Sequence, residues 1–391
     1  MSLFADHYKG RRVFITGHTG FKGFWLTSWL LELGAEVAGF SLDVPTSPSG
    51  FSVLGLEKRI RHFRGDVRDL AALKTAFAEF KPEIVFHMAA QALVRPSYAD
   101  PVLTFETNAM GTLNVLEAVR AFSSVEALVL ITSDKCYRND EWVWGYREND
   151  HLGGKDPYSA SKACAELIAH AYFSSFFSRG PHVATVRAGN VIGGGDWALD
   201  RIVPDCARAW SEGRPVSIRS PMATRPWQHV LEPLSGYLWL GACLLQENKG
   251  LGCGPFSGVR PCNRESFNFG PPADVNATVQ EVVTTLTVHW PGFVFSIDGE
   301  GQGAKQESTL LKLCCDKALA YTGWKPALVL DESMAFTAEW YRYYYELVNG
   351  NAGMGEGGIA QSDADAMYAF TARQIAAYAA KAAHGGLIWT G

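Results

Sequence analysis

The first half of the chain alternates short apolar runs with longer stretches in which apolar residues recur every three or four positions. The short runs indicate strands, and they cover residues 11–16, 36–41, 60–65, 83–89, 126–132 and 182–187. The longer stretches predict helices over residues 21–33, 69–80, 101–122 and 157–177. Mostly apolar strands that alternate with helices predict an α/β fold with a doubly wound parallel sheet.

The pattern changes near residue 188, where Gly and Pro become frequent, as in GGGDW and SPMATRPW. Helices are still expected near 226–246 and 274–288. We predict a first domain over residues 1–187, with parts of 226–266 returning to it, and a smaller α/β C-terminal domain over 188–225 and 267–345. A weak linker at 350–363 belongs to a C-terminal tail, 350–391, that we expect to be helical and peripheral.

Composition narrows the class of protein. The chain has 391 residues, a net charge of -5 and 47% hydrophobic residues, so it is globular and offers no basic surface for nucleic acid. It has no apolar run of roughly 18 residues that would span a membrane. The first residues, MSLFADHYKGRRV, lack the apolar core of a signal peptide, which favours the cytoplasm. Without HxxxH, HExxH or CxxC patterns, we expect no metal.

A glycine-rich turn, GHTGFKG, follows the first predicted strand and opens a helix. Gly17 permits a tight turn, Gly20 lets the backbone approach a pyrophosphate, and Gly23 lets the helix pack on the strand. The helix start, which includes Phe21, adds backbone N–H groups and the positive end of a dipole. This context predicts a dinucleotide site in a Rossmann-type sheet.

The strands that follow supply further expected cofactor contacts. Ser41 stands where the second strand would normally end in an acid, and Asp43 follows two residues later. No arginine stands there to receive a 2′-phosphate, so we predict NAD rather than NADP, with Asp43 as a candidate contact. After the third and fourth strands, the expected cofactor contacts are Asp66, Val67, Ala89 and Ala90.

Two motifs carry candidate chemistry. Tyr158 and Lys162 are four residues apart on a predicted helix and share one face. The ammonium would lower the pKa of the phenol, making it a usable base, and would also reach the nicotinamide ribose. The strand LVLIT ends in Ser133, Asp134 and Lys135, at the sheet edge where ligands bind in such folds.

Over about residues 10–345, the chain resembles the extended short-chain dehydrogenase/reductase family. The likeness lies in GHTGFKG, HMAAQ, YSASK, RPWQHV and the helix that carries Asn108. Within that family, the Ser-Asp-Lys triplet and EWVWGYRENDHLGGKDPYSASKA are similar to sugar-nucleotide 4,6-dehydratases that act on CDP-glucose. The resemblance implies NAD as cofactor, with Asn108, Tyr158 and Lys162 among its contacts. It also implies deoxysugar biosynthesis for surface polysaccharide such as lipopolysaccharide O-antigen.

The same resemblance implies a role for each catalytic candidate. Tyr158 would take the proton of the C4 hydroxyl while Ser133 holds that oxygen, and NAD supplies reversible hydride transfer. Lys135, in its neutral form, would remove the C5 proton. Asp134 would protonate the departing C6 hydroxyl, which leaves as water.

Substrate contacts are also implied by the positions of residues in relatives. These contacts are Asn190, Arg201, Arg225 and Asn268. We interpret Trp197, Trp227 and His229 as core residues. Relatives commonly associate through the helices at 101–122 and 157–177, which implies a homodimer or homotetramer.

Three other functions stay open. A sugar-nucleotide 4-epimerase needs Tyr158 and Lys162 but neither Asp134 nor Lys135. A redox-sensing regulator that binds a dinucleotide usually lacks an intact Tyr-x-x-x-Lys motif. A dehydratase for dTDP-glucose or GDP-mannose is disfavoured by Lys135, where most such relatives carry glutamate.

Overall fold

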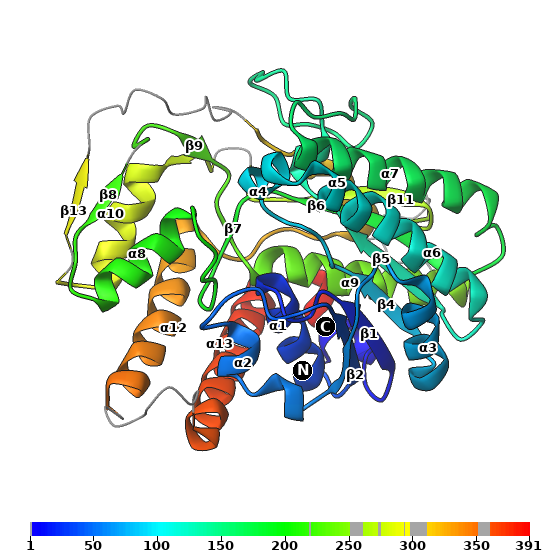
Figure 1. Cartoon of the computed structure of the whole chain (residues 1–391), viewed down its shortest axis with the longest axis horizontal. Helices are drawn as coiled ribbons and strands as arrows, with labels where there is room; N and C mark the ends of the chain where they lie inside the picture. Colours follow the sequence, from blue (N-terminus) through cyan, green and yellow to red (C-terminus); the bar gives the residue numbers. More distant parts are fainter. Residues whose placement is uncertain are drawn as a thin grey trace.

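The computed structural model describes residues 2–218, 220–250, 261–272, 275–292, 294–297, 311–350 and 360–391. Its centre is a seven-stranded sheet in the order β11-β6-β5-β4-β1-β2-β3, with every neighbouring pair parallel (Figure 1). These strands are β1 (Arg12–Thr16), β2 (Glu36–Ser41), β3 (Arg61–Arg64), β4 (Ile84–His87), β5 (Ala127–Ile131), β6 (His182–Ala188) and β11 (Glu265–Phe269). The predicted doubly wound parallel sheet is confirmed.

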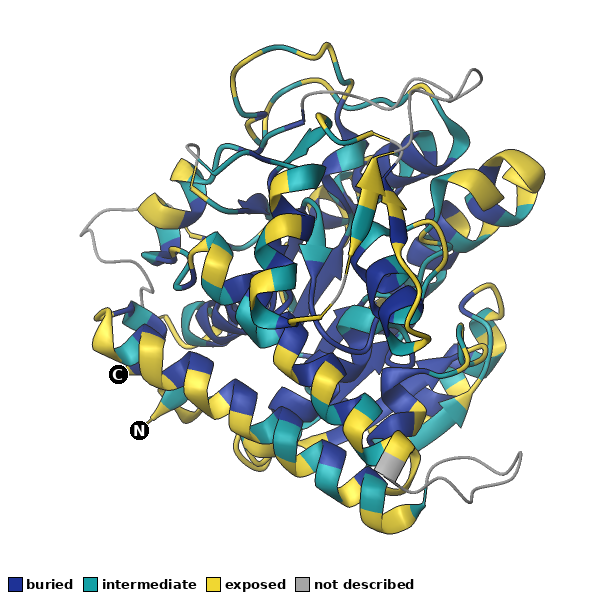
Figure 2. Cartoon of the chain, turned by 90° about the vertical axis from the view of Figure 1, so that its left-hand side faces the viewer, coloured by how far each residue is buried: buried dark blue, intermediate teal, exposed yellow. Residues whose placement is uncertain are grey.

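Helices cover both faces of this sheet. The α-helices of the first domain are α1 (Phe21–Glu32), α2 (Gly50–Val53), α3 (Leu70–Phe80), α4 (Val94–Ala99), α5 (Pro101–Phe105), α6 (Gly111–Ala121), α7 (Pro157–Ser175) and α9 (Leu231–Asn248). Val13 and Ile15 face a core that includes α1 and α9, whereas Phe14 faces a core with α3, α6 and α7. The central strands are therefore buried, as is most of α9, whereas α3 and α7 expose their outer faces; the mix of buried and exposed segments is visible in Figure 2.

Five short helical segments complete the list of helices near the sheet. They are η1 (Leu3–Asp6), η2 (Leu56–Lys58), η3 (Glu106–Met110) and η4 (Asp134–Cys136), with η5 (Ile388–Thr390) near the C-terminus. The expected helix at 101–122 is confirmed as a continuous helical run over 101–121, in which η3 is a π-helical turn between α5 and α6. That turn carries Asn108, one of the expected cofactor residues.

The expected second domain lies beside the carboxyl edge of the sheet (Figure 1). Its helices are α8 (Ile202–Ser211), α10 (Val279–His289) and α12 (Leu330–Gly350), whereas α11 (Asp316–Thr322), also expected in this domain, packs on β11 and α9. Its short strands are β7 (Val191–Ile192), β8 (Val216–Ile218), β9 (Thr224–Arg225), β10 (Gln228–His229), β12 (Ala277–Thr278) and β13 (Phe295–Ile297). They pair as β7 with β10, β8 with β13 and β9 with β12.

The return of the chain to the sheet, expected within 226–266, reaches Phe269 because β11 pairs with β6. Residues 251–260, 298–310 and 351–359, which fall within the expected returning segment, second domain and linker, lie outside the described residues, as do a few single positions such as 274. The expected core placement of Trp197, Trp227 and His229 is confirmed by their burial.

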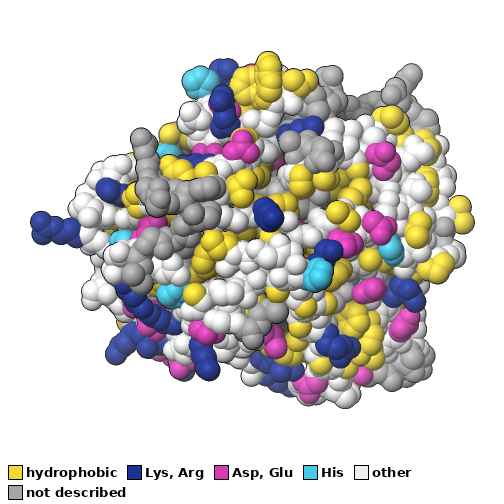
Figure 3. All heavy atoms as spheres, turned by 180° about the vertical axis from the view of Figure 1, so that it is seen from behind, with side chains coloured by type: hydrophobic (Ala, Val, Ile, Leu, Met, Phe, Trp, Pro, Cys, Tyr) yellow, Lys and Arg dark blue, Asp and Glu magenta, His cyan; other side chains and the backbone are white. Residues whose placement is uncertain are grey.

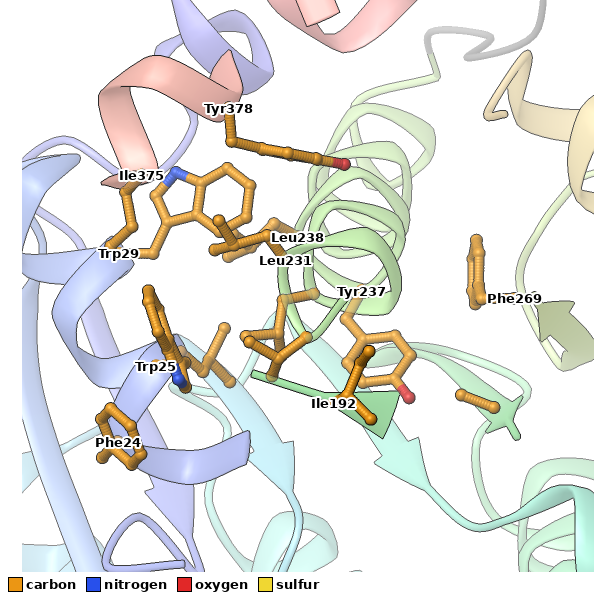
Figure 4. Packing of buried hydrophobic residues seen from close by; sticks show 14 of the residues in the cluster. Phe24, Trp25, Trp29, Ile192, Leu231, Tyr237, Leu238, Phe269, Ile375 and Tyr378 are labelled. Atoms are coloured by element: carbon orange, nitrogen blue, oxygen red, sulfur yellow. The ribbon is translucent and has the colours of Figure 1, made fainter. Parts of the chain in front are cut away.

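The C-terminal tail forms the helix α13 (Gln361–His384). It is not peripheral, because its inner face joins the core around α1 and α9. In Figure 4, Tyr378 lies over Trp29 and Ile375 beside it, and the two rings meet edge to face at 5.6 Å. The tail then brings Trp389 onto Phe4 with stacked rings 5.0 Å apart, so the two termini meet.

Trp389 gives a direct test of whether the C-terminal tail is part of the core. Its ring is fully buried against Phe4, Trp29 and Tyr378. Trp389→Ala is expected to lower the free energy of unfolding by about 3–5 kcal/mol, measured by urea denaturation. The matched change Trp144→Ala removes an indole that is 69% exposed and should change it by less than about 0.5 kcal/mol. Equal effects of the two variants would contradict the core role of the tail.

Candidate active site

The glycine turn has the geometry that a pyrophosphate cradle needs. Gly17 has a φ of +77°, and a Cβ there would stand 2.6 Å from the Ala89 nitrogen. A Cβ on Gly23 would stand 2.2 Å from the Gly17 carbonyl oxygen, so the helix could not pack as closely. Gly20 precedes α1 as its N-cap, and only the Gly17 oxygen, at 3.4 Å, would meet its Cβ. These three positions, with Phe21 at the helix start, fit a dinucleotide phosphate.

A matched pair of variants tests this cradle. Gly17→Ala is expected to weaken NAD binding about tenfold, a loss of about 1.4 kcal/mol, because its Cβ would displace Ala89. Gly213→Ala is the control, since Gly213 also has a positive φ, +67°, but nothing within 4 Å of its Cβ position. Isothermal titration measures both affinities. The same loss in both variants would show backbone strain, not the close approach at Ala89, as the cause.

At the end of β2, Asp43 is exposed and its carboxylate lies 3.4 Å from the Arg64 guanidinium. The expectation that no arginine stands near Asp43 is therefore wrong. Arg64 comes from the neighbouring strand, where it is in register with Ser41. The two side chains also line a cavity of about 450 Å³ with Thr19 and His62.

The remaining expected cofactor residues differ in how far other protein groups already engage or bury their side chains. Asp66 lies beside Arg68, whose hydrogen bonds outweigh burial and lower the pKa of the carboxyl. Val67 is buried against Gly111, and Ala89 and Ala90 are partly buried after β4. The Asn108 amide accepts from the Gln91 N–H at 2.8 Å and donates to the Gln91 carbonyl and to Ser161. Through these bonds Asn108 joins the loop after β4 to α7, and its direct contact with the cofactor stays a prediction.

The residues after β5 form a tight turn. The Ser133 side chain caps η4 by accepting from the Lys135 N–H at 3.2 Å, and it donates to the Asp134 carboxylate at 2.9 Å. Ser133 and Asp134 are buried, 7% and 4% exposed, and Lys135 is half-buried on the same turn. Ser133 also lies close enough to the Tyr158 phenol of α7 to lower its pKa. The structure thus brings the expected hydroxyl, acid and phenol into one chain of contacts.

The electrostatics of Tyr158 differ from the expectation. Burial raises the pKa of Tyr158 to about 12, Asp134 raises it further, and Ser133 and Arg201 lower it. Lys162, which was expected to lower this pKa, is not among the main influences on it. Burial lowers the pKa of Lys162 itself to about 8.

Lys22 is a site residue that the sequence motifs do not reveal. Burial lowers its pKa to about 8, while Asp134 raises it and Arg201 and Lys162 lower it, which places the amine among the catalytic groups. The amine lies 5.9 Å from the centre of the Tyr237 ring. One signal could have found it: Lys22 is the only charged residue in α1 before Glu32. A cation in an otherwise apolar helix start needs a partner.

The four expected substrate residues differ in their surroundings. Arg201 pairs with Asp196 at 2.7 Å, and its charge reaches Tyr158, so it lies at the site. Asn190 follows β6 and is partly buried, and Arg225 ends β9 and donates to the Thr224 carbonyl. Asn268 is fully buried and donates to the carbonyls of Tyr146 and Cys314. Through these contacts Asn268 supports the backbone at Tyr146 and Cys314. The substrate-binding roles of all four residues stay predictions.

The described residues also bear on metal binding and on insertion into a membrane. Within the described ranges, no group of three or more His, Cys, Asp or Glu side chains could hold a metal ion. No described helix has both the length and the apolar character needed to cross a bilayer. On the face in Figure 3, basic and acidic side chains are interspersed.

The parallel sheet, the glycine turn and the Ser133, Tyr158 and Lys162 side chains define a dinucleotide-dependent short-chain dehydrogenase/reductase. The family model of GDP-mannose 4,6-dehydratase matches residues 14–241, more than half of the chain. The chain therefore belongs to the GDP-mannose 4,6-dehydratase family.

Individual relatives agree with this assignment. The chain is 48% identical to the CDP-glucose 4,6-dehydratase of Salmonella typhimurium, over 86% of this chain and 92% of that protein. Its fold matches the UDP-glucose 4-epimerase of Thermus thermophilus, solved with NAD, at a TM-score of 0.68 and 26% identity over 85% and 99% of the two chains. A dTDP-glucose 4,6-dehydratase of Streptomyces venezuelae shares the fold at a TM-score of 0.66 and 21% identity, over 85% and 97% of the two chains.

Proposed function

We propose that the chain converts CDP-D-glucose to CDP-4-dehydro-6-deoxy-D-glucose and water, as an NAD-dependent hydro-lyase of deoxysugar biosynthesis. One observation carries the choice of reaction: the buried Asp134 carboxylate accepts a hydrogen bond from Ser133, which itself contacts Tyr158. Oxidation of an alcohol needs the hydroxyl and the phenol only. An acid in the same chain of contacts supplies what a departing hydroxide needs, a proton. The 48% identity to a CDP-glucose 4,6-dehydratase supports this substrate.

NAD fits the site because Gly17, Gly20 and Gly23 leave room for a backbone-bound pyrophosphate. When bound, it supplies reversible hydride transfer. Lys162, with a pKa lowered to about 8 by burial, would hold the nicotinamide ribose while it is protonated. Asp43, Asp66, Val67, Ala89 and Ala90 are proposed to border the adenosine half.

The chain's own residues then divide the proton transfers. Tyr158 accepts the proton of the C4 hydroxyl, and Ser133 holds that oxygen. The C5 proton becomes acidic beside the resulting ketone, and Lys135 removes it. Asp134, in its protonated form, donates a proton to the C6 hydroxyl, so that water leaves. Lys135 then returns its proton to C5 as C6 takes up the hydride that was removed from C4.

Recognition of the nucleotide is proposed for Arg201, Asn190 and Arg225, which come from the loops of the second domain. Arg201 is the best supported, because its charge reaches Tyr158. A guanidinium suits a diphosphate, to which it can donate two parallel hydrogen bonds. Asn268 is proposed to act through Tyr137, whose hydroxyl donates to it at 2.8 Å.

One experiment tests this function. The protein is incubated with NAD and, in separate reactions, with CDP-, dTDP-, UDP- and GDP-hexoses, and products are followed by mass spectrometry. Loss of one water from CDP-glucose, faster than from the other substrates, is the expected result. An isomer of unchanged mass would indicate a 4-epimerase, and no product from any sugar nucleotide would indicate a dinucleotide-binding regulator.

We also propose that the protein acts as a homodimer or homotetramer. Val102 and Met110, which are 66% and 49% exposed, lie on α5 and η3 beside a shallow apolar pocket. An exposed apolar patch favours association with another copy. Light scattering with the variant Val102→Lys tests this surface, because a charge there should favour the monomer. The cytoplasm remains the proposed location.

A further inference from the structure

A buried ion pair lies directly behind the catalytic turn. Glu166 of α7 and Arg187 of β6 are both fully buried and form two hydrogen bonds, of 2.8 and 2.9 Å. Removing two charges from water costs more than such a pair regains against a well-packed apolar alternative. Stability is therefore a weak explanation for the pair, and its other contacts point to a second role.

Those contacts reach both ends of the segment that carries Ser133, Asp134 and Lys135. The Glu166 carboxylate accepts from the hydroxyl of Thr132, the residue just before Ser133. The Arg187 guanidinium donates to the Tyr137 hydroxyl at 2.7 Å, just after η4. The catalytic turn is thus held at its start by the carboxylate and at its end by the guanidinium.

The same carboxylate acts on the Tyr-Lys helix. Glu166 lies one turn of α7 beyond Lys162, and its charge raises the pKa of that ammonium against the lowering by burial. Burial would raise the pKa of Glu166, but Arg187 and hydroxyl donors lower it to about 2, so the carboxylate stays ionised. The Glu166 side chain therefore influences both the conformation of the turn and the charge of Lys162.

Other titratable groups around Lys162 do not replace this charge. Burial raises the pKa of the Cys136 thiol in η4, which keeps it neutral. Burial lowers the pKa of His87 in β4 to about 3, so it is also neutral. Lys22 in α1 is a cation and opposes a second positive charge. Glu166 thus supplies the ionised carboxylate that acts on Lys162.

We propose that Glu166 and Arg187 are positioning residues that clamp the turn at 132–137 against α7 and hold Lys162 in its charged form. The proposal rests on the proposed roles of Tyr158 and Lys162 and adds two residues that do not touch the substrate. The effect on the conformation of the turn and the effect on the charge of Lys162 can be tested in separate experiments.

The charge is tested with the double variant Glu166→Gln/Arg187→Gln, which removes both charges and keeps two hydrogen-bonding groups. We expect the basic limb of the kcat/KM profile to move to lower pH by about one unit, because Glu166 is among the main groups that shift the pKa of Lys162 and Arg187 is not. The pH dependence of NAD binding, followed by tryptophan fluorescence, should move in the same direction.

Thr185→Val is the matched control. It removes the Thr185 hydroxyl that donates to Glu166 at 2.8 Å, but it keeps the carboxylate charge. It should lower the melting temperature and leave both pH profiles where they are in the parent protein. A folded double variant with unshifted profiles would overturn the role in charge.

The geometry is tested with Tyr137→Phe, which also serves if the double variant does not fold. This change keeps the ring stacked on Tyr146 at 5.2 Å but removes the hydroxyl that Arg187 holds. We expect kcat to fall about tenfold, because small misplacements of catalytic groups are costly, with NAD affinity and the basic limb unchanged. The control Tyr172→Phe loses a hydroxyl contact to Glu117 away from the turn and should keep full activity.

Unchanged kcat in Tyr137→Phe would overturn the clamp. Failure of the proposed function looks different: the parent protein would then form no dehydrated product. The pH dependence of NAD binding would still report on Glu166 and Lys162 in that case.

Discussion

Lys135→Ala is expected to slow the loss of water from CDP-glucose by at least about a hundredfold while CDP-glucose and NAD still bind. Lys135 is the proposed base for the C5 proton, and alanine offers no group that could take it. Oxidation at C4 needs Tyr158 and Ser133, which this change leaves in place. The variant should therefore accumulate bound NADH, seen by absorbance, without release of a product lighter by one water.

Deuterium exchange locates the affected step. In D2O the parent protein should place deuterium at C5 of the product, and Lys135→Ala should place almost none. Lys155→Ala is the control, because Lys155 is exposed just before α7 and has no proposed role. Dehydration by Lys135→Ala at the parent rate would remove Lys135 from the mechanism and reopen the question of the base. Lys135→Glu is less informative, since glutamate could itself accept the proton.

Local patterns were enough to predict the frame of the molecule. A few neighbouring residues are enough to recognise an apolar run such as LVLIT, the turn GHTGFKG and the four-residue spacing of Tyr158 and Lys162. The confirmed parallel sheet follows from such runs, because strands buried on both faces must be apolar throughout. The glycine turn and the residues after β5 then meet at one edge.

What could not be predicted depends on register and burial. Arg64 lies near Asp43 only because β3 pairs with β2 so that Arg64 is opposite Ser41. The contact from Thr132 to Glu166 and the approach of Arg187 likewise require β5 beside β6. The sequence distances between such partners carry no periodic signal. These contacts can be identified only once the pairing and register of the strands are known.

The tail illustrates a different limit. Residues 361–384 show a helical pattern rich in alanine, which indicates little about what the helix packs on. Its burial depends on Trp29 and Phe4, far away in the sequence, which offer aromatic surfaces to Tyr378 and Trp389. Glu232 adds to this docking by accepting from the Tyr378 hydroxyl at 2.8 Å. A sequence without its fold cannot show such partners.

Tyr158→Phe is expected to lower kcat on the order of a thousandfold, with the NAD dissociation constant nearly unchanged. Only the hydroxyl is lost, and this hydroxyl is the group whose pKa Ser133 lowers and Asp134 raises. With a pKa raised to about 12 by burial, the phenol is protonated at neutral pH. The parent rate should therefore rise with pH until Lys162, with a pKa of about 8, loses its proton.

The pH profile and a matched tyrosine separate this role from a loss of packing. Tyr158→Phe should show a small residual rate that does not rise with pH, because the titrating phenol has been removed. Tyr146→Phe is the control: its hydroxyl is also bonded, accepting from the Asp140 N–H at 2.7 Å, but it lies outside the contacts of Ser133 and Asp134. It should retain most of the activity. If Tyr158→Phe kept more than about a tenth of the parent rate, the phenol would be a binding group, and the proton of the C4 hydroxyl would have to leave by another base.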